Sequence, residues 1–315
     1  MPTPTLELRA LRKAFGKFQA VDGVSLTVPP GTVFGLLGPN GAGKTTTIRM
    51  LMDIIGPDSG EVWLFGNRRR RKDLDRVGYL PEERGLYRKM TVSEQLLFLG
   101  QLHGRGRREL EPRIEEWLGK VGLGDRARAK VEELSKGMQQ KVQLVGTLLH
   151  DPELLILDEP FSGLDPINQG LFKDLLAAHK EAGRTVLFST HVMEQAEKLC
   201  DHIALIARGR VVLEGQLAEL KRRMSGNSYR LVARGDLAAL AELPEVEEVL
   251  AGDGAARLLA RPGVEASQLL RQLVSRVAVE EFRSAEPDLE EIFVKAVHEA
   301  MGEDAARAAA EEIPA

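Results

Sequence analysis

The alternation of apolar and polar residues near the start of the chain predicts a group of short strands. Segments 6–11 and 24–28 alternate with period two, which is the pattern of antiparallel strands with one buried face. Segment 32–38 is almost entirely apolar, so we expect it in a parallel sheet that is covered on both faces. A helix is predicted to follow, from about residue 43 to residue 53.

The middle of the chain changes to a helical period. The run that begins at Thr91 has Glu94 three residues later, which is a capping box at the start of a helix. Two more helices are predicted, one over 107–121 and one after Ser135, each with apolar residues on one face. These residues are Ile114, Trp117, Leu118 and Val121 in the first, and Val142, Val145 and Leu149 in the second. Residues 91–150 are therefore predicted to form a helical insert.

Strands return after the insert, at 153–158 and 185–190, with a helix predicted over 167–182 between them. A strand, a helix and a strand in this order are typical of a parallel α/β sheet. Segment 202–215 is predicted to be a hairpin that turns at Arg208 and Gly209.

A domain boundary is predicted near 222–228, where Ser, Gly and Asn cluster. Beyond it, the pattern predicts a small α+β domain of the split-βαβ type. Its strands are expected at 229–234, 246–250, 256–260 and 278–284, and its helices at 236–242, 265–276 and 288–298. We place the larger domain at 1–222 and the smaller one at 225–300, with 301–315 expected to be a flexible tail.

Composition excludes several classes of protein. The net charge of −4 over 315 residues gives no reason to expect a nucleic acid partner. The single cysteine, Cys200, rules out an intrachain disulfide and fits a reducing, cytosolic compartment. The start of the chain lacks the apolar core of a signal peptide, and no apolar run is long enough to span a bilayer. If the protein works at a membrane, another chain must supply the spanning part.

The sequence "GPNGAGKTT" fits the phosphate-binding pattern G-x-x-x-x-G-K-[ST]. Glycines let consecutive backbone N–H groups point inward, and the helix that starts after them adds its positive end. Lys44 is expected to neutralise the β- and γ-phosphates of ATP, and the Thr45 hydroxyl to hold Mg²⁺. The predicted nucleotide-binding residues of this loop are Gly38, Pro39, Asn40, Gly41, Ala42, Gly43, Lys44, Thr45 and Thr46.

Two acids follow the buried strand in "LLILDEP". Asp158 ends the strand and is expected to reach Mg²⁺ through water, as the Asp of a Walker B motif does. Glu159 is then placed to polarise the water that attacks the γ-phosphate. His191 ends another predicted strand, where an imidazole could contact the γ-phosphate and orient that water. A pair of helix-capping carboxylates and an ordinary surface or core histidine are the alternatives.

Five motifs occur along the chain in this order: "GPNGAGKTT", "LSKGMQQ", "LLILDEP", "SGLDP" and "STH". Together they resemble the motifs of the ATP-binding subunit of an ABC transporter. The resemblance covers about 1–222 and implies a P-loop NTPase core of α/β class, with a mixed sheet, an antiparallel β subdomain and the helical insert. It also implies a head-to-tail dimer with a second ATPase subunit, identical or different, in which two ATP molecules are sandwiched.

The resemblance assigns roles to individual residues. It makes Glu159 the catalytic base, Asp165 the residue that communicates across the dimer and His191 the switch histidine. The aromatic residue that stacks on adenine falls on Phe15, with Phe18 as the weaker choice and a core phenylalanine as the alternative for both. The signature segment, which completes the other subunit's site, comprises Leu134, Ser135, Lys136, Gly137, Met138 and Gln139. Lys136 and Met138 depart from the usual L-S-G-G-Q pattern.

One further departure lies where the ATPase core meets the insert. The family places a glutamine there, whereas this chain has Glu82, or Glu83 if the register differs by one residue. A carboxylate can also approach Mg²⁺, so the hypothesis is a tighter dependence on Mg²⁺. Leu86, Tyr87 and Met90, which follow this position, are expected either to line the groove that receives a permease helix or to pack the insert.

This variant loop, "LSKGMQQ" and an extra C-terminal domain are similar to the sodium- and drug-export branch of the family. The implied partner is an integral membrane permease, which would hold the protein at the inner face of the cell membrane. The alternatives are a soluble ABC-type switch that acts without a permease, and a C-terminal domain that carries a regulatory or dimerising function. The basic run at 68–72 is expected to be a solvated face or, alternatively, to contact anionic lipid headgroups.

Overall fold

The computed structural model describes residues 2–83, 85–224, 227–252, 254–285 and 287–302. The chain divides into two units, and each is described here by itself. The first unit runs from the N-terminus to Gly215 and includes residues from Ala296 onward, and the second runs from Gln216 to Lys295.

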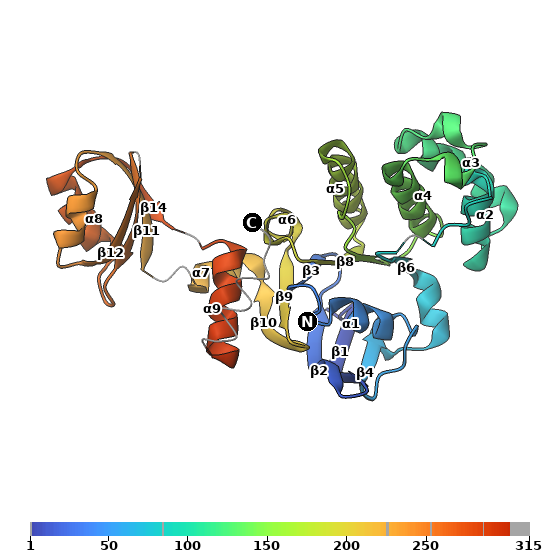
Figure 1. Ribbon diagram of the computed structural model, residues 1–315, viewed down its shortest axis with the longest axis horizontal. Coiled ribbons are helices and arrows are strands. Elements are labelled where there is room, and N and C mark those ends of the chain that lie inside the picture. The colour runs from blue at the N-terminus through green and yellow to red at the C-terminus, as the bar shows by residue number, and fades with distance from the viewer. Residues whose placement is uncertain (1, 84, 225–226, 253, 286, 303–315) are drawn as a thin grey trace. The chain divides into compact units, whose positions relative to one another are not determined.

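A six-stranded sheet forms the centre of the first unit (Figure 1), with strand order β10-β9-β3-β8-β7-β6. The strands are β3 (Val33–Leu37), β6 (Val77–Leu80), β7 (Leu154–Asp158), β8 (Thr185–Thr190), β9 (His202–Ala207) and β10 (Arg210–Gln216). Every residue of β3, β7 and β8 is buried, and these strands pair in parallel, as their apolar sequences predict. The predicted hairpin is confirmed, because Arg208 and Gly209 both have positive φ between β9 and β10.

An antiparallel sheet of order β2-β1-β4-β5 forms a second layer. Its strands are β1 (Leu6–Phe15), β2 (Phe18–Val28), β4 (Ser59–Leu64) and β5 (Asn67–Arg68). The predicted strands 6–11 and 24–28 are confirmed but are parts of two longer strands that form one hairpin. β4, β5 and the parallel strand β6 were not predicted, since each is short or interrupted by polar residues.

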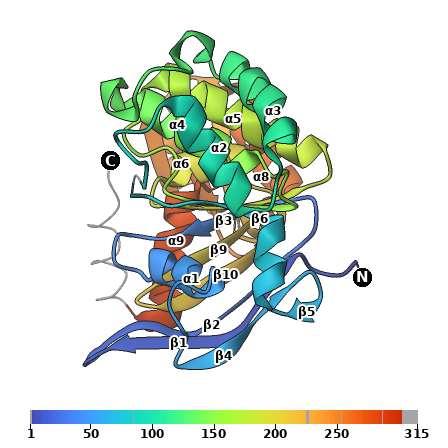
Figure 2. The same cartoon turned by 90° about the vertical axis from the view of Figure 1, so that its right-hand side faces the viewer.

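Helix α1 (Lys44–Leu51) lies between the two sheets of the first unit (Figure 2). Its Ile48, Met50 and Leu51 join a core that also takes residues from both sheets. The 3₁₀ helix η1 (Arg71–Arg76) follows β5. The expectation of a solvated face at 68–72 is wrong for Arg69, whose guanidinium donates to the carbonyl oxygens of Met50 and Leu51 and caps the end of α1.

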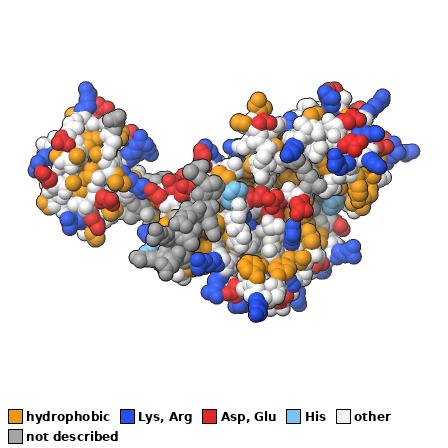
Figure 3. Space-filling model, viewed as in Figure 1, with side chains coloured by type: hydrophobic (Ala, Val, Ile, Leu, Met, Phe, Trp, Pro, Cys, Tyr) orange, Lys and Arg blue, Asp and Glu red, His pale blue; other side chains and the backbone are white. Residues whose placement is uncertain are grey.

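The helical insert lies on the other side of the six-stranded sheet from α1 (Figure 1). It consists of α2 (Val92–Leu102), α3 (Arg107–Lys120), the 3₁₀ helices η2 (Gly124–Arg126) and η3 (Val131–Glu133), and α4 (Lys136–Leu148). The capping box is confirmed, because Thr91 Oγ1 accepts from the Glu94 N–H and Glu94 accepts from the Thr91 N–H. Acidic and basic side chains are interspersed over the surface of the insert (Figure 3), including the i,i+4 pairs Arg107–Glu111 and Glu116–Lys120.

Two helices complete the first unit around the strand ends. α5 (Pro166–Glu181) is the helix predicted between the two strands, and Asp165 caps its start. α6 (Met193–Leu199) was not predicted, because it has only seven residues and begins two residues after His191.

The second unit has the predicted split-βαβ topology, with strand order β12-β13-β11-β14 and antiparallel pairing throughout. Its elements are α7 (Leu217–Met224), β11 (Ser228–Arg234), η4 (Ala238–Glu242), β12 (Val246–Gly252), β13 (Ala255–Ala260), α8 (Ala266–Arg276), β14 (Ala278–Ser284) and the part of α9 (Leu289–Met301) that precedes Ala296. The helix predicted at 236–242 is the 3₁₀ helix η4. Residues 303–315, which contain most of the predicted flexible tail, lie outside the described residues.

Candidate nucleotide-binding and hydrolysis site

The glycine-rich loop connects buried β3 to α1. Gly38, Gly41 and Gly43 have φ values of 149°, 78° and 104°. A Cβ on Gly43 would lie 2.5 Å from the Ala20 carbonyl oxygen, and a Cβ on Gly38 would clash with the Ile206 carbonyl oxygen. Only glycine fits these two positions, so the loop can turn tightly before α1, whose first amides have no partner inside the helix.

The remaining loop residues divide between anchors and an open tip. Pro39 and Ala42 are buried, and the Ala42 N–H donates to the Pro39 carbonyl at 3.2 Å. Asn40 and Gly41 are exposed at the tip, and no atom comes within 4 Å of a Cβ placed on Gly41. Thr46 is half-buried in the first turn of α1.

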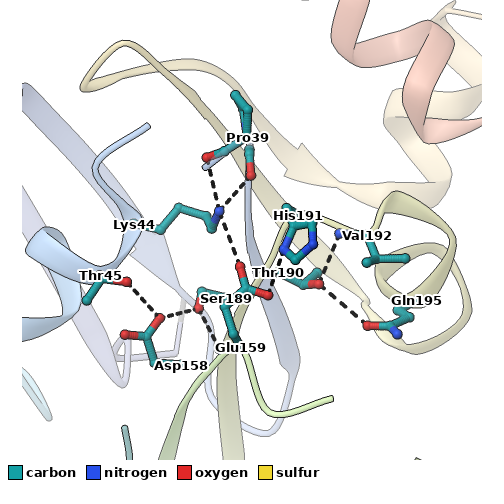
Figure 4. A network of polar contacts seen from close by, with 11 residues as sticks. Pro39, Lys44, Thr45, Asp158, Glu159, Ser189, Thr190, His191, Val192 and Gln195 are labelled. Atoms are coloured by element: carbon teal, nitrogen blue, oxygen red, sulfur yellow. Dashed lines mark hydrogen bonds and ion pairs between the residues drawn. The ribbon is translucent and has the colours of Figure 1, made fainter. Parts of the chain in front are cut away.

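Lys44 lies between this loop and the end of β7 (Figure 4) and is only 5% exposed. Its Nζ donates to the carbonyl oxygens of Gly38 at 2.7 Å and Pro39 at 3.1 Å. The same nitrogen forms an ion pair with Glu159 Oε1 at 3.3 Å. The side chain thus brings one positive charge to the concave side of the loop.

Asp158 is fully buried at the end of β7 and is held by two hydroxyl groups (Figure 4). Its Oδ1 accepts from Ser189 Oγ at 2.5 Å and from Thr45 Oγ1 at 3.2 Å. Its Oδ2 is buried and has no hydrogen-bond partner among the described residues. Burial, more than any other cause, raises the pKa of the Asp158 carboxyl, and the neighbouring charge of Glu159 adds to the rise.

Glu159 has a backbone conformation that is uncommon for a residue with a side chain, with φ of 49°. Its N–H donates to Ser189 Oγ at 3.0 Å, so one hydroxyl fixes both Asp158 and Glu159. The Glu159 side chain is 9% exposed, and its Oε2 lies 3.0 Å from His191 Nδ1. A carboxylate only accepts hydrogen bonds, so Nδ1 of His191 donates.

A cavity of about 310 Å³ opens beside these acids. Glu82, Asp158 and Glu159 line it, together with Gln140 and Gln143 of α4. The Glu83 side chain is instead 90% exposed and lies 3.9 Å from Arg49. This placement supports Glu82 over Glu83 as the residue at the glutamine position of the family.

Gln140 and Gln143 are site residues that the sequence reasoning missed. The buried Gln140 donates from Nε2 to the carbonyl oxygen of Pro160, the residue after Glu159, at 2.8 Å. Its Oε1 is buried and has no hydrogen-bond partner among the described residues. Gln143 donates to the Glu83 carbonyl at 3.1 Å. The available signal was a pair of glutamines three residues apart on a helix whose other buried residues are mostly apolar.

The signature segment forms the start of α4. Ser135 is the N-cap, and its Oγ accepts from the Met138 N–H at 3.3 Å. Ser135 and Lys136 are exposed, whereas Leu134 and Met138 pack into the core of the insert. Gln139 donates to the Leu134 carbonyl at 3.0 Å. The anchors of the segment are therefore Leu134, Met138 and Gln139, and its exposed polar side chains are those of Ser135 and Lys136.

Asp165 lies next to the signature segment. Its Oδ1 accepts from the Asn168 N–H at 3.0 Å, and this backbone hydrogen bond is the main cause that lowers the pKa of the Asp165 carboxyl. The Asn168 amide nitrogen would lie 3.2 Å from a Cβ placed on Gly137. A side chain at position 137 would therefore press against the residue that Asp165 holds.

Phe15 and Phe18 face each other at the tip of the β1–β2 hairpin and are 51% and 62% exposed. Neither is a core residue, so that alternative is wrong for both. Lys13 Nζ lies over the Phe15 ring, 5.8 Å from the ring centre. An exposed ring at this position can stack on a base without reading its edges.

The donor set fits ATP and Mg²⁺. The glycine backbone and Lys44 match phosphate oxygens, and the unpartnered Asp158 Oδ2 beside Thr45 Oγ1 matches a hard divalent cation. No three His, Cys, Asp or Glu side chains converge on a metal position in the described parts of the chain. Mg²⁺ would therefore take most of its ligands from phosphate and water, as is usual for this ion.

The phosphate loop connects a buried parallel strand to a helix, and it faces an acidic pair at the end of β7, a parallel strand of the same sheet. These features define a P-loop nucleotide hydrolase. The family model for ABC transporters matches residues 21–162, and that for the C-terminal domain of DrrA1-3-like ATP-binding proteins matches residues 215–297. The chain belongs to the ATP-binding proteins of ABC transporters and is an ATPase.

Individual relatives support this assignment. The chain is 39% identical to the ABC transporter ATP-binding protein YhaQ of Bacillus subtilis, over 93% of this chain and 98% of that protein. It is 42% identical to Nod factor export ATP-binding protein I of Paraburkholderia xenovorans, over 68% and 72% of the two chains. A solved ATP-binding subunit of an ABC transporter superposes with a TM-score of 0.64 at 32% identity, over 70% of this chain and 92% of that one.

Proposed function

We propose that this chain hydrolyses ATP with Glu159 as the base and drives a separate membrane permease, as the energising subunit of an exporter. The observation that carries the proposal is the position of the Glu159 carboxylate. It is buried between Lys44 at 3.3 Å and His191 at 3.0 Å, and it lines a cavity with room for water. A carboxylate held in this way can accept a proton from water that attacks the γ-phosphate.

Other residues of the site supply binding and positioning. Lys44 and the loop amides hold the phosphates, and Phe15 stacks on the base. Thr45 and Asp158 hold Mg²⁺ with Glu82 nearby, and the metal supplies charge neutralisation on the phosphates when it is bound. His191 donates to Glu159 and keeps that carboxylate oriented toward the cavity.

The signature segment completes the site of a second subunit in the proposal. Ser135 and Gly137 present a hydroxyl group and a helix N-terminus, both of which favour a phosphate oxygen. The exposure of Ser135 and Lys136 supports this role, since their polar groups are accessible to a partner. Asp165 and Asn168, which lie against Gly137, would transmit the state of one site to the other.

The proposals of a permease partner and of export as the direction of transport rest on membership of the family. None of the helices in the described ranges combines the length and apolar character that crossing a membrane requires. Export is supported by the relative that is named for Nod factor export. The exposed Tyr87, which is packed edge-on against Phe98 at 5.5 Å, is the proposed contact for a permease helix at the inner face of the membrane. We propose 1–222 and 225–300 as the limits of the ATPase and C-terminal domains.

The test is the oligomeric state of Glu159→Gln, measured by size-exclusion chromatography with light scattering. With Mg-ATP this variant should form a stable dimer, because ATP is bound and not consumed. Adding Lys44→Ala to it should return the protein to the monomer, which serves as the matched control. A Glu159→Gln protein that stays monomeric with ATP, both alone and with its co-purified membrane fraction, would contradict the proposal. A polytopic membrane protein should co-purify with the tagged chain, whereas a soluble client would favour the switch without a permease.

A further inference from the structure

The open face of the C-terminal sheet carries a row of arginines across three strands. Arg230 of β11 lies directly opposite Arg257 of β13 on one side and Arg283 of β14 on the other. Residues directly opposite each other in antiparallel strands project from the same face. The neighbours Leu231, Leu258 and Phe282 pack into the core of the unit, so the arginines project from the face that α8 does not cover (Figure 1).

The charges of this row are only partly compensated. Arg257 is paired with Glu291, at 2.8 Å between Nη2 and Oε2, and Arg283 is paired with Glu281 at 2.6 Å. Arg230 lies in the middle of the row, and its side chain forms no hydrogen bond or ion pair with any of the described residues. Like charges directly opposite each other on a sheet destabilise it, so an anion at Arg230 would be stabilising.

The three arginines line one cavity, and a second cavity adjoins it. All three arginines line a cavity of about 500 Å³, together with Leu250 and Ser284. A neighbouring cavity of about 300 Å³ shares Arg257 and Leu250. Half of the residues that line the second cavity are apolar: Met224, Leu250, Leu259, Pro287 and Ile292. Besides the shared Arg257, its charged groups are Glu248, Lys295 and Glu291, and Glu291 is the ion-pair partner of Arg257. Leu250, where the two cavities meet, is 61% exposed.

We propose that this groove binds a small amphipathic organic anion, one molecule per chain. Its phosphate or carboxylate head would lie at Arg230 between Arg257 and Arg283, since guanidinium groups bind such heads through paired hydrogen bonds. Its apolar body would lie over Leu250 and Leu259. The aromatic pair Tyr229 and Phe282, stacked at 5.0 Å, packs against the core and does not line the groove, so the face lacks the stacking platform of an RNA-binding sheet.

Isothermal titration calorimetry of the full-length protein tests this proposal with four probes. Octyl phosphate and octanoate carry a head and an apolar body, inorganic phosphate lacks the body, and octanol lacks the charge. Octyl phosphate should bind with a stoichiometry of one, and inorganic phosphate about tenfold or more weakly, because inorganic phosphate has no CH₂ groups to bury in the apolar cavity. Arg230→Gln should weaken octyl phosphate about tenfold, which is the effect of losing one charge-assisted hydrogen bond.

Substitutions inside and outside the groove show whether octyl phosphate binds there or elsewhere on the protein. Leu250→Ser should weaken octyl phosphate but not inorganic phosphate, whereas Arg276→Gln, at the exposed end of α8, should change neither. ATP turnover should survive Arg230→Gln, which separates this proposal from that for the ATPase site. Equal affinity of Arg230→Gln and the native chain would overturn the inference. The inference would also be overturned if the protein bound only vesicles of phosphatidylglycerol and not octyl phosphate. It would equally be overturned if a dimer contact blocked the groove and excluded octyl phosphate.

Discussion

His191 Nδ1 lies 3.0 Å from Oε2 of Glu159, and the other oxygen of that carboxylate faces Lys44 at 3.3 Å. The carboxylate is held between two side chains: the imidazole of His191, which follows β8, and the ammonium group of Lys44, which follows the phosphate loop. The carboxylate that the proposal makes the base is thus fixed in orientation before any reaction.

Glu159→Gln should lower kcat of the ATPase about 10²- to 10⁴-fold, because the amide cannot accept the proton of the attacking water. Affinity for ATP should change little, since the Lys44 contacts with the loop remain. Single-turnover hydrolysis and a nucleotide-binding titration measure the two quantities. A rate within tenfold of the native rate would remove Glu159 from the role of base.

Glu82→Gln tests the departure at the junction of the core and the insert. Glu82 lines the same cavity as Asp158, so its negative charge should raise the affinity of the site for Mg²⁺. The variant should need a higher Mg²⁺ concentration for half-maximal ATPase activity and keep most of its rate when Mg²⁺ is saturating. Glu83→Gln is the matched control and should have little effect, because its side chain is 90% exposed. A large loss of rate at saturating Mg²⁺ would instead give the Glu82 carboxylate a chemical role of its own.

Gln140→Leu should lower kcat about tenfold and leave KM for ATP nearly unchanged. The substitution removes the hydrogen bond that links α4 to the Pro160 carbonyl, next to Glu159, at a cost of about 1–3 kcal/mol for the carbonyl left unsatisfied. Steady-state kinetics and a thermal melt report the two effects separately. If the melting temperature falls while kcat is unchanged, Gln140 only stabilises the fold and does not position Glu159.

His150 predicts a loss of stability in acid. Its ring stacks on His103 at 3.7 Å between centres, and its Nε2 donates to the Val77 carbonyl at 3.1 Å. Burial lowers the pKa of His150 to about 4, below its ordinary value near 6.5. The folded state thus favours the neutral ring, so stability is full above about pH 6.5 and falls as the pH drops toward 4.

The corresponding measurement is the urea midpoint between pH 7 and pH 4. Burial also lowers the pKa of His103 and, to about 4, that of His179, so the native chain should lose stability steeply across this range. His150→Gln can keep a donor to Val77 while removing one titrating group. The slope should then decrease by up to about 1.4 kcal/mol per pH unit. An unchanged slope would show that His150 does not titrate with unfolding.

The sequence predicted those parts of the site that depend on local patterns. The phosphate loop, the acids that follow β7 and the cap at Ser135 are each fixed by a few adjacent residues. The parallel pairing of the apolar strands and the split-βαβ order of the C-terminal unit also followed from the pattern. The small strands β4, β5 and β6 did not, because their pairing partners, more than their own residues, make them strands.

The parts that the sequence could not predict depend on contacts between distant residues. Ser189 begins the "STH" motif, but the motif does not show what its hydroxyl contacts. Only the register of β7 and β8 places Ser189 opposite Asp158. The role of Gln140 similarly requires α4 to lie against the turn after β7. Arg69 was hidden in a run of basic residues, and its contact with α1 arises from the packing of that helix between two sheets.

The central claim is that one subunit's signature segment acts on ATP bound by the other, and mixing two inactive variants tests it most directly. Lys44→Ala lacks a working phosphate loop, and Ser135→Arg lacks a working signature segment, so each alone should hydrolyse little ATP. In a mixed dimer one of the two sites is intact, so an equal mixture should recover up to about a quarter of the native ATPase rate, given random pairing. A mixture that forms mixed dimers and recovers no activity, or a Ser135→Arg protein that hydrolyses ATP at the native rate, would contradict the account.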